Sequence, residues 1–399
     1  MAMALEGVRI LDLSVFQQGT HASAMLADLG ADVIKIESYD NPDPGRASGG
    51  DPAPNGIRPY FAILNRNKRG IALDLKNPIG RETFLKLIET ADIFHSNMRM
   101  GVLERMNLTY DVVKQRNPRI IFSQATGWGH LGPDAEAHLG SVDGLAQARG
   151  GLLSINGTKE SGPHNVPLSL ADQIGGMISA FGMMAALWER EKSGVGQEVN
   201  TSLYGSQIAL QNFNITGAMW NQKNPELRGK DEARPHWGTY VCSDGGLLMV
   251  AGTTPDRWWK EFCETVGSPE SGEGTYSKNQ VDTAWCVKTR AALGQCFATK
   301  TRDEWMSILS PKFLVQPVRK YLEIAEDPQA WANGYLTKIA WGEAELPIVG
   351  LPVHMSRTPG SVRTLAPEVG QHTEEILLEA GWSWEEIAAM REAGAFGKE

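Results

Sequence analysis

The sequence predicts an α/β protein, in which a large domain with a doubly wound parallel sheet is accompanied by a smaller α+β domain. Three observations predict this fold class. Short β-rich apolar runs alternate with helical segments through the first half of the chain. A stretch rich in helix- and strand-breaking residues at 150–167 precedes the longest helical pattern. Near Asn221 the sequence becomes polar and charged. Alternating strands and helices are typical of βαβ units, whose parallel strands are covered by helices on both faces.

The first βαβ unit occupies residues 8–37. Val8–Leu13 is a β-rich apolar run, and Asp32–Glu37 is another. Between them, Ala22–Leu29 carries apolar residues at helical spacing, with Gly30 as the stop. Strand, helix and strand within about 30 residues form one such unit.

The same pattern continues to residue 196. Strands are predicted at Ile71–Leu75, Ile93–His95 and Ile120–Ser123, and helices at Gly80–Glu89 and Tyr110–Gln115. The longest helix is indicated by apolar residues that recur at helical spacing from Ile174 to Trp188, and Gly194 ends it.

The second half predicts a hairpin followed by tryptophan-rich helices. Tyr240–Ser243 and Leu247–Ala251 flank the turn Asp244-Gly245-Gly246. The tail holds a helix-turn-helix pattern at Thr373–Arg391. We therefore expect a large domain at 1–205, a linker at 206–225, a small domain at 226–330, and a return linker and C-terminal segment at 331–399 that packs on the large domain.

Composition excludes several classes of function. The chain has 399 residues, 42% of them apolar, and a formal net charge of −9. The negative charge disfavours nucleic acid and anionic membranes as partners. We see no signal peptide, and no apolar run of membrane-spanning length. The four cysteines lack metal-ligand spacing, so we expect reduced thiols, no metal site and a cytoplasmic location.

A dinucleotide site is the first hypothesis that the βαβ unit suggests, because Glu37 ends the second strand. Such a site needs a glycine-rich turn between strand and helix. Residues 14–21 contain a single glycine, Gly19. The sequence therefore disfavours a nicotinamide or flavin cofactor.

Several strings, in order along nearly the whole chain, resemble the family III CoA-transferases, the group that contains formyl-CoA:oxalate and carnitine CoA-transferases. They are LADLGADVIKIE at 26–37, NRNKRGIALDLK at 65–76, ADIFHSNMRMG at 91–101, GWGHLGP at 127–133 and APEVGQHT at 366–373. The resemblance implies an acyl-CoA:carboxylate CoA-transferase with an acyl-CoA donor and a carboxylic acid acceptor. It also implies no permanently bound cofactor, with the coenzyme A thioester as substrate.

The resemblance assigns the catalytic carboxylate to Asp172, at the start of the longest helix. The residue would form a mixed anhydride and then an aspartyl-CoA thioester. By itself, an aspartate in this place is a good helix N-cap, and we expect the helix N-terminus to keep it ionised. Exposed N–H groups there could stabilise an oxyanion, and Gly175 and Gly176 would let a thioester come close.

For coenzyme A binding the resemblance points to Gln17, in the loop after the first strand, and to Asn97. Lys68, Arg69, Arg99 and Arg105 supply positive charge for phosphates, with solvated surface charge as the alternative for each. Phe16, Trp128 and Trp237 are candidates for an acyl pocket, with ordinary packing as the alternative. The sequence departs from the family at Ser38, where some transferases have arginine, and lacks a glycine-rich loop around 234–240, which disfavours oxalate and formate.

Two other functions stay open. The α-methylacyl-CoA racemases share the fold, but they place a histidine before an aspartate in a G-H-D string, whereas this chain has Val142 before Asp143. A non-catalytic subunit of a hetero-oligomer is the second alternative. The resemblance also implies a homodimer with interlocked chains, and apolar residues such as Phe213 and Trp220 in the linker need a covering surface.

Overall fold

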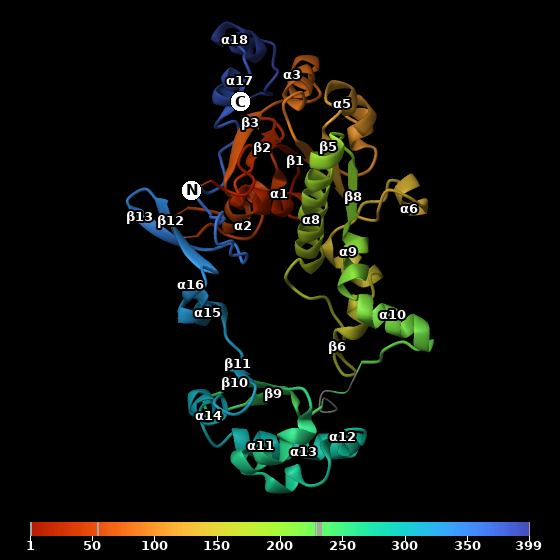
Figure 1. The fold of residues 1–399 in the computed structure, drawn as a ribbon, viewed down its shortest axis with the longest axis vertical. Coiled ribbons are helices and arrows are strands. Elements are labelled where there is room, and N and C mark those ends of the chain that lie inside the picture. The colour runs from red at the N-terminus through yellow and green to blue at the C-terminus, as the bar shows by residue number, and fades with distance from the viewer. Residues whose placement is uncertain (1, 54–55, 228, 230–233, 399) are drawn as a thin grey trace. The chain divides into compact units, whose positions relative to one another are not determined.

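The computed structural model describes residues 2–53, 56–227, 229 and 234–398. The chain divides into two compact units (Figure 1). The first comprises Met1–Leu153, Asn165–Lys223 and Trp331–Glu399, and the second comprises Ser154–His164 and Asn224–Ala330.

The first unit is built on a sheet of six parallel strands, which confirms the predicted α/β class. The strand order is β3-β2-β1-β4-β5-β8. The strands are β1 Arg9–Leu13, β2 Asp32–Glu37, β3 Lys68–Ala72, β4 Ile93–Ser96, β5 Ile121–Thr126 and β8 Glu198–Ser202. The order reverses between β1 and β4. In sheets of this type, a ligand binds outside the carboxyl ends of the strands at such a reversal.

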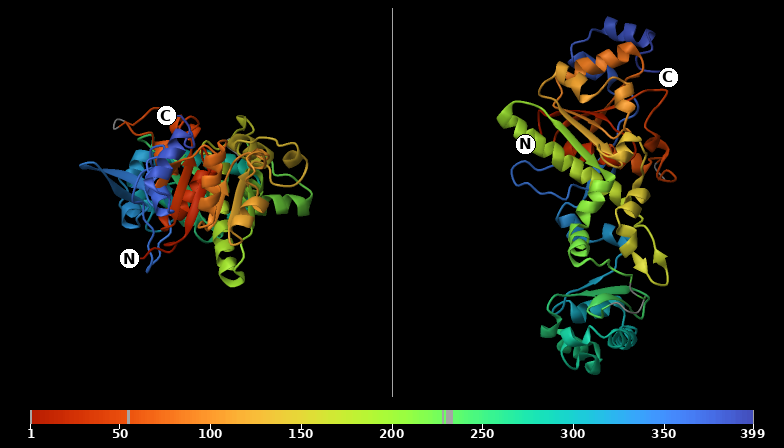
Figure 2. Two further views of the ribbon diagram at one scale, coloured as in Figure 1. Left: turned by 90° about the horizontal axis from the view of Figure 1, so that it is seen from above. Right: turned by 90° about the vertical axis from the view of Figure 1, so that its right-hand side faces the viewer.

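Helices cover both faces of this sheet. Neighbouring residues on one strand, such as Ile10 and Leu11, belong to different cores because successive side chains point to opposite faces. One core lies under α1 (Gln18–Asp28) and α8 (Leu170–Ser193), which pack side by side (Figures 1 and 2). The other lies under helices from two parts of the chain, namely α3 (Pro78–Ile88), α5 (Tyr110–Arg116), α17 (Thr373–Glu379) and α18 (Trp384–Glu392). The C-terminal pair α17 and α18 thus completes the core of the first unit.

The third strand, β3, begins three residues before the predicted start at Ile71, because charged residues lead it into the sheet. Lys68 pairs with Asp12 on β1 at 2.8 Å, and Arg69 pairs with Asp32 on β2 at 2.8 Å. An apolar pattern cannot reveal a strand whose first residues are buried by ion pairing. The sequence therefore predicts this strand but not its start.

Helix α8 ends where the sequence predicts, since Gly194 takes a left-handed conformation with φ of +76° as its C-cap. By length and composition α8 is also one helix that could cross a membrane. Its buried side chains, among them Met183 and Leu187, pack into the core with α1 and the sheet. The structure therefore uses α8 as a core helix, and the cytoplasmic location stays a prediction.

The stretch 206–225, expected as a linker, is largely helical. It contains most of α9 (Leu203–Leu210) and all of α10 (Asn212–Asn221). Shorter elements of the first unit that matter below are α2 (Pro59–Leu64), α4 (Val102–Arg105) and α7 (Asp143–Arg149), and a hairpin is formed by β12 (Leu336–Trp341) and β13 (Ala344–Val349).

The second unit contains the predicted hairpin. Strands β9 (Trp237–Val241) and β10 (Leu247–Ala251) pair antiparallel, and β11 (Val315–Pro317) joins β10. Three helices, α11 (Trp259–Val266), α13 (Thr283–Phe297) and α14 (Arg302–Leu309), pack on this sheet around an aromatic core. In that core Tyr240 stacks on Phe297 with ring centroids 4.7 Å apart.

Candidate active site

A cavity of about 490 Å³ lies in the first unit, where the strand order reverses. Its walls come from the segments that follow β1, β4 and β5, and from the N-terminal turns of α7 and α8. Of the residues predicted for catalysis and coenzyme A binding, four line it, namely Gln17, Asn97, Arg99 and Asp172. The topology of the sheet thus brings together residues that are far apart in the chain.

The loop between β1 and α1 is held through its backbone. Both the N–H and the carbonyl of Val15 bond to the side-chain amide of Asn97, each at 2.8 Å. Asp43 accepts the N–H of Phe16 at 3.0 Å, and Lys35 donates to the carbonyl of Ser14 at 2.9 Å. Phe16 has φ of +56°, an uncommon conformation for a bulky residue, which these contacts maintain.

Asn97 therefore differs from the expected coenzyme A contact. Its amide oxygen and nitrogen are both used by Val15, so this side chain positions the loop that carries Gln17. Gln17 itself is buried at the cavity wall, at the N-cap of α1.

The structure contradicts the prediction that Lys68 binds a phosphate. Its side chain is fully buried, and the ammonium donates to Asp12, to the carbonyl of Thr20 and to Asn65 at 2.8–3.0 Å. Burial alone would raise the pKa of Asp12, but Lys68 and Lys35 hold it down at about 2. A lysine that is satisfied in this way fixes β3 to β1 and does not face the cavity.

The other three basic residues predicted to bind phosphate lie in different environments from Lys68 and from one another. Arg99 lines the cavity and is exposed. Arg105, on α4, is also exposed, and its Nη1 lies 3.1 Å from the position that a Cβ on Gly101 would take, next to the lining residues Met100 and Val102. Arg69 is used by ion pairs to Asp32, Glu375 and Glu379. Arg99 and Arg105 are thus the predicted phosphate ligands left at or beside the cavity.

Asp172 lies in the first turn of α8 but does not cap it, contrary to expectation. Ser169 is the N-cap residue, with φ of +46°, and neither side chain caps the helix. The cap comes from Asp143 on α7, whose Oδ1 accepts the N–H of Ala171 at 2.6 Å and that of Asp172 at 3.3 Å. The Asp172 side chain is therefore left free to line the cavity.

The environment of Asp172 favours its protonated form. Burial, and then the charge of Asp143, raise the pKa of Asp172 to about 7. The expectation that the helix N-terminus keeps this carboxyl ionised was wrong, because burial and a like charge outweigh the helix dipole. Burial also raises the pKa of Tyr60, a lining residue on α2, and Asp172 and Asp43 add to that effect.

The N–H groups that could bind an oxyanion lie at the start of α1, whereas the sequence analysis expects them at the start of α8. At the start of α8, Ala171 and Asp172 donate to Asp143, and Gln173 donates to the carbonyl of Ser169 at 2.9 Å. At the start of α1, within the described part of the chain, the N–H groups of Gln18 and Gly19 have no acceptor. Free N–H groups at a helix start are suited to stabilising negative charge.

Aromatic residues form part of the wall. Phe16 and Trp128 line the cavity, as two of the three acyl-pocket candidates. Trp128 is fixed by a bond from its Nε1 to the carbonyl of Gly140 at 3.1 Å and by the Arg149 guanidinium, 4.8 Å from its ring centroid. Trp237 lies in the second unit, where it lines a separate cavity of about 360 Å³.

The lining contains no base of the kind that a racemase needs. Val142 occupies the position before Asp143 and is 61% exposed at the cavity. No histidine is among the described lining residues, and both His130 and His138 lie outside the lining. Nor do the described residues contain a cluster of three or more potential metal ligands.

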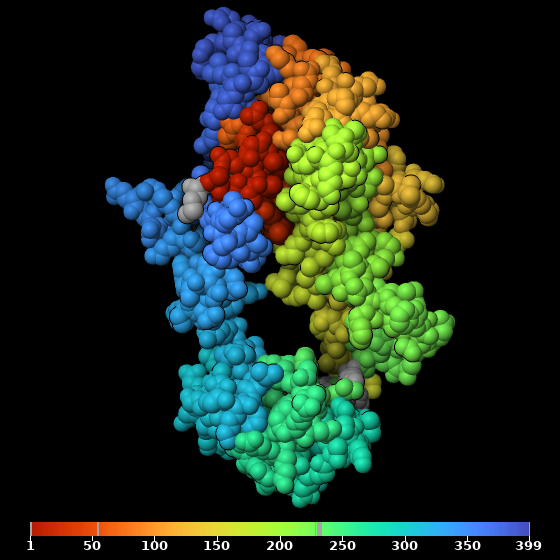
Figure 3. Space-filling view, in the orientation of Figure 1, coloured from red at the N-terminus to blue at the C-terminus, as the bar shows by residue number. Residues whose placement is uncertain are grey.

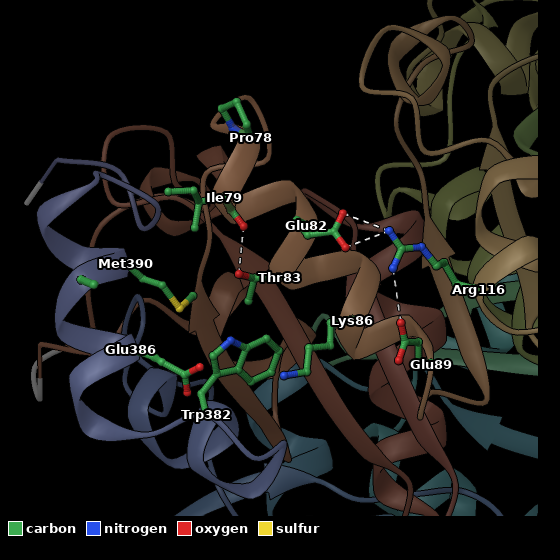
Figure 4. A pocket seen from close by; sticks show the side chains of 11 residues that line it. Pro78, Ile79, Glu82, Thr83, Lys86, Glu89, Arg116, Trp382, Glu386 and Met390 are labelled. Carbon is green, nitrogen blue, oxygen red and sulfur yellow. Dashed lines mark hydrogen bonds and ion pairs between the residues drawn. The ribbon is translucent and has the colours of Figure 1, made fainter.

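A larger cavity, of about 720 Å³, lies between α3, α5 and α18 (Figure 4). Its charged groups are satisfied locally, since Arg116 pairs with Glu82 and Glu89, and the Lys86 ammonium lies 3.9 Å from the Trp382 ring centroid. None of the predicted site residues lines it. Volume alone therefore does not identify the active site.

Three residues of the site were missed as site residues by sequence reasoning. The sequence marks Asp143 only as the neighbour of Val142, and it gives no reason to choose Gln18 in addition to Gln17. Nothing in the sequence around Tyr60 indicates that it would line the cavity, because α2 reaches the site only through the tertiary fold.

The chain matches the sequence model of CoA-transferase family III over residues 5–373. It is 32% identical to (R)-2-hydroxy-4-methylpentanoate CoA-transferase of Clostridioides difficile, with 98% of this chain and 99% of that protein covered. It is 31% identical to formyl-CoA:oxalate CoA-transferase of Afipia carboxidovorans, with coverage of 100% and 99%. It is 29% identical to succinyl-CoA:mesaconate CoA-transferase of Haloarcula hispanica, with coverage of 95% and 96%.

The fold matches that of a solved CAIB/BAIF family protein from Brucella suis. The TM-score is 0.85 at 25% sequence identity, and the match covers 95% of this chain and 100% of the other.

Proposed function

The chain belongs to CoA-transferase family III, and from this premise we propose that it moves coenzyme A between carboxylic acids through the carboxylate of Asp172. The single observation that carries the proposal is the position of Asp172. Its side-chain carboxyl has no protein hydrogen bond within the described residues, and it lines the same cavity as Gln18, whose N–H at the start of α1 has no acceptor among those residues.

The proposed reaction is a series of acyl exchanges. An oxygen of Asp172 attacks the donor thioester, the carbon–sulfur bond breaks, and a mixed anhydride and the coenzyme A thiolate result. The thiolate attacks the Asp172 acyl carbon, which releases the donor acid and leaves an aspartyl-CoA thioester. The acceptor carboxylate then displaces the thiolate in the same way, and the thiolate finally attacks the acceptor's acyl carbon.

The chain's own residues would contribute positioning and charge stabilisation. The N–H groups of Gln18 and Gly19 would bind the oxygen that becomes negative as the tetrahedral intermediates form. Asp143 would hold the first turn of α8 and keep the pKa of Asp172 near the working pH. A carboxyl with a pKa near 7 is also more nucleophilic, once ionised, than one near 4.

For coenzyme A we propose contacts from Gln17, Arg99 and Arg105. Arg99 and Arg105 are exposed, and an arginine can bind a phosphate through two parallel hydrogen bonds. Asn97 would act indirectly, by holding the loop that carries Gln17. Coenzyme A would thus be bound as a substrate, without a permanently held cofactor, and the free cysteines suit a reducing, cytoplasmic environment.

The acids that the named relatives act on differ in size and polarity. The wall here contains Phe16, Trp128, Leu139 and Val142, which favour an acid with an apolar side chain over oxalate or formate. The test is a screen for coenzyme A exchange, with acetyl-CoA and succinyl-CoA as donors against a panel of acids. Absence of exchange with every acid would end the proposal.

We propose further that the chain forms a homodimer with interlocked subunits. Helix α8 exposes Phe181 and Trp188 on one stripe, and α10 exposes Phe213 and Trp220, which are 86% and 82% exposed. The green segment that contains α10 lies at the surface in the space-filling view (Figure 3). Large aromatic residues exposed together mark an interaction surface. Light scattering or mass photometry should show no monomer at nanomolar concentration. Differently tagged pools should not exchange subunits without unfolding, and rapid exchange would exclude interlocked chains.

A further inference from the structure

Gln18 lines the active-site cavity with a side chain whose amide nitrogen is buried against α8. It is the first residue of α1, it is only 4% exposed, and it lines the same cavity as Asp172. Its Nε2 is buried and has no hydrogen-bond partner among the described residues. Buried amides are nearly always hydrogen-bonded, and of the described residues with an unpartnered buried amide, Gln18 is the one that lines this cavity.

The amide lies against α8, close to the nucleophile. A Cβ on Gly175 would come within 2.8 Å of Gln18 Nε2 and 3.1 Å of its Cγ, so the side chain rests directly on this glycine. Gly175 follows Asp172 by three residues, which places the two on the same helix face, one turn apart. An acyl group bonded to Asp172 would therefore have the Gln18 amide within reach of its first carbons.

We propose that Gln18 is a specificity-determining residue that selects acids with a hydroxyl group on carbon 2. The inference rests on the proposed function, because it needs an acyl group bound next to Asp172. A hydroxyl both donates and accepts, so it fits the carboxamide in either orientation of its oxygen and nitrogen.

Two features favour a neutral hydroxyl on carbon 2 over other partners. The proposed function assigns the acyl oxygen to the backbone N–H groups of Gln18 and Gly19, which have no acceptor among the described residues. A second carboxylate at this place would lie near Asp143, whose charge already raises the pKa of Asp172.

The test compares acids that differ only in this hydroxyl. Wild-type enzyme is assayed with 2-hydroxy-4-methylpentanoate and 4-methylpentanoate as acceptors, and with lactate and propionate as a second pair. The wild type should prefer the hydroxy acid of each pair. In Gln18→Met, which keeps the side-chain length, the ratio of the two kcat/KM values should fall by about 10- to 100-fold, since the hydroxyl loses its buried partner.

Gln207 provides a matched control. It is a fully buried glutamine on α9 whose amide is also unpartnered, but it does not line the cavity. Gln207→Met should leave the ratio unchanged. Gly175→Ala should lower the ratio while the amide is retained, because the new methyl group displaces Gln18. This variant also keeps the test decisive if Gln18→Met does not fold.

Two results would overturn the inference: no preference in the wild type, or an unchanged ratio in Gln18→Met, which includes an equal loss for both acids of a pair. These are distinct from failure of the proposed function, in which the wild type transfers coenzyme A to no acid at all.

Discussion

Asp143 caps the helix that carries Asp172, since its Oδ1 accepts the N–H groups of Ala171 at 2.6 Å and of Asp172 at 3.3 Å. The cap places one carboxylate next to another that is already buried. Together, burial and the charge of Asp143 raise the pKa of Asp172 to about 7. A contact that stabilises the helix therefore also adjusts the ionisation of the proposed nucleophile.

The pH dependence of transfer should report this pKa. Ionised Asp172 is the reactive form, so kcat/KM should rise with pH on an acid limb centred near 7. Asp143→Asn keeps an oxygen for the cap but removes the charge, so the limb should move to lower pH by roughly 0.5–1 unit. The shift is partial because burial is the larger cause. An acid limb of kcat/KM centred near pH 4 in the wild type would contradict a raised pKa of Asp172.

Ionisation of Asp172 should affect stability in the opposite direction from activity, because the ionised carboxyl is the reactive form but destabilises the folded protein. The folded pKa of Asp172, about 7, lies above the value of 3.8 that is ordinary for an aspartate, so the folded protein is destabilised by ionisation as pH rises between these values. Asp172→Asn should therefore unfold less easily than wild type at pH 8, by on the order of 2 kcal/mol. The difference should vanish below about pH 3, where the carboxyl is protonated in both the folded and the unfolded protein. Urea titrations at the two pH values measure it, and equal stability at pH 8 would contradict it.

Asp172→Asn and Asp172→Ala should abolish transfer while the fold and coenzyme A binding persist. Hydroxylamine should inactivate wild-type enzyme that has been incubated with acyl-CoA, because it attacks the aspartyl anhydride or thioester and leaves an unreactive aspartyl hydroxamate. Intact-mass analysis should show an adduct of coenzyme A on the peptide that contains Asp172. Normal turnover in the asparagine variant would end the covalent mechanism.

The loop before α1 should need Asn97. Asn97→Ala removes both bonds to Val15, which should lower stability by about 1–3 kcal/mol and kcat/KM by at least about 10-fold, as the loop loses its position. Asn117 is a matched control, since its amide donates to the carbonyls of Ile88 and Ala91 outside the cavity. Asn117→Ala should lose similar stability but keep kcat/KM at temperatures where it is folded. Equal kinetic losses would show that Asn97 acts only through stability.

Incubation of a 2-methylacyl-CoA in heavy water should leave its α-hydrogen unexchanged. Val142 cannot take up a proton, and no histidine is among the described lining residues. Nuclear magnetic resonance or mass spectrometry measures the exchange. Rapid deuterium incorporation at that carbon would indicate a base that this arrangement does not provide.

Local patterns account for the elements that the sequence predicts well. The strands β1, β2, β4 and β5 are apolar runs, and Gly194 ends α8, because periodicity and backbone conformation depend on neighbours in the chain. The start of β3 cannot be predicted from such local patterns, because Lys68 is buried through its ion pair with Asp12, which lies on another strand. For the same reason, the sequence alone does not distinguish Lys68 from a lysine that is free to bind phosphate.

The sequence by itself determined the α/β class, the family to which the chain belongs and the candidate nucleophile, because each is expressed in contiguous strings of residues. The tertiary structure alone decided which side chains are free to act. It assigned the cap of α8 to Asp143, gave Asn97 to Val15, and left the amide of Gln18 unpartnered. The ionisation and hydrogen bonding of a side chain depend on burial and on partners that lie far away in the chain, and periodicity carries no information about either.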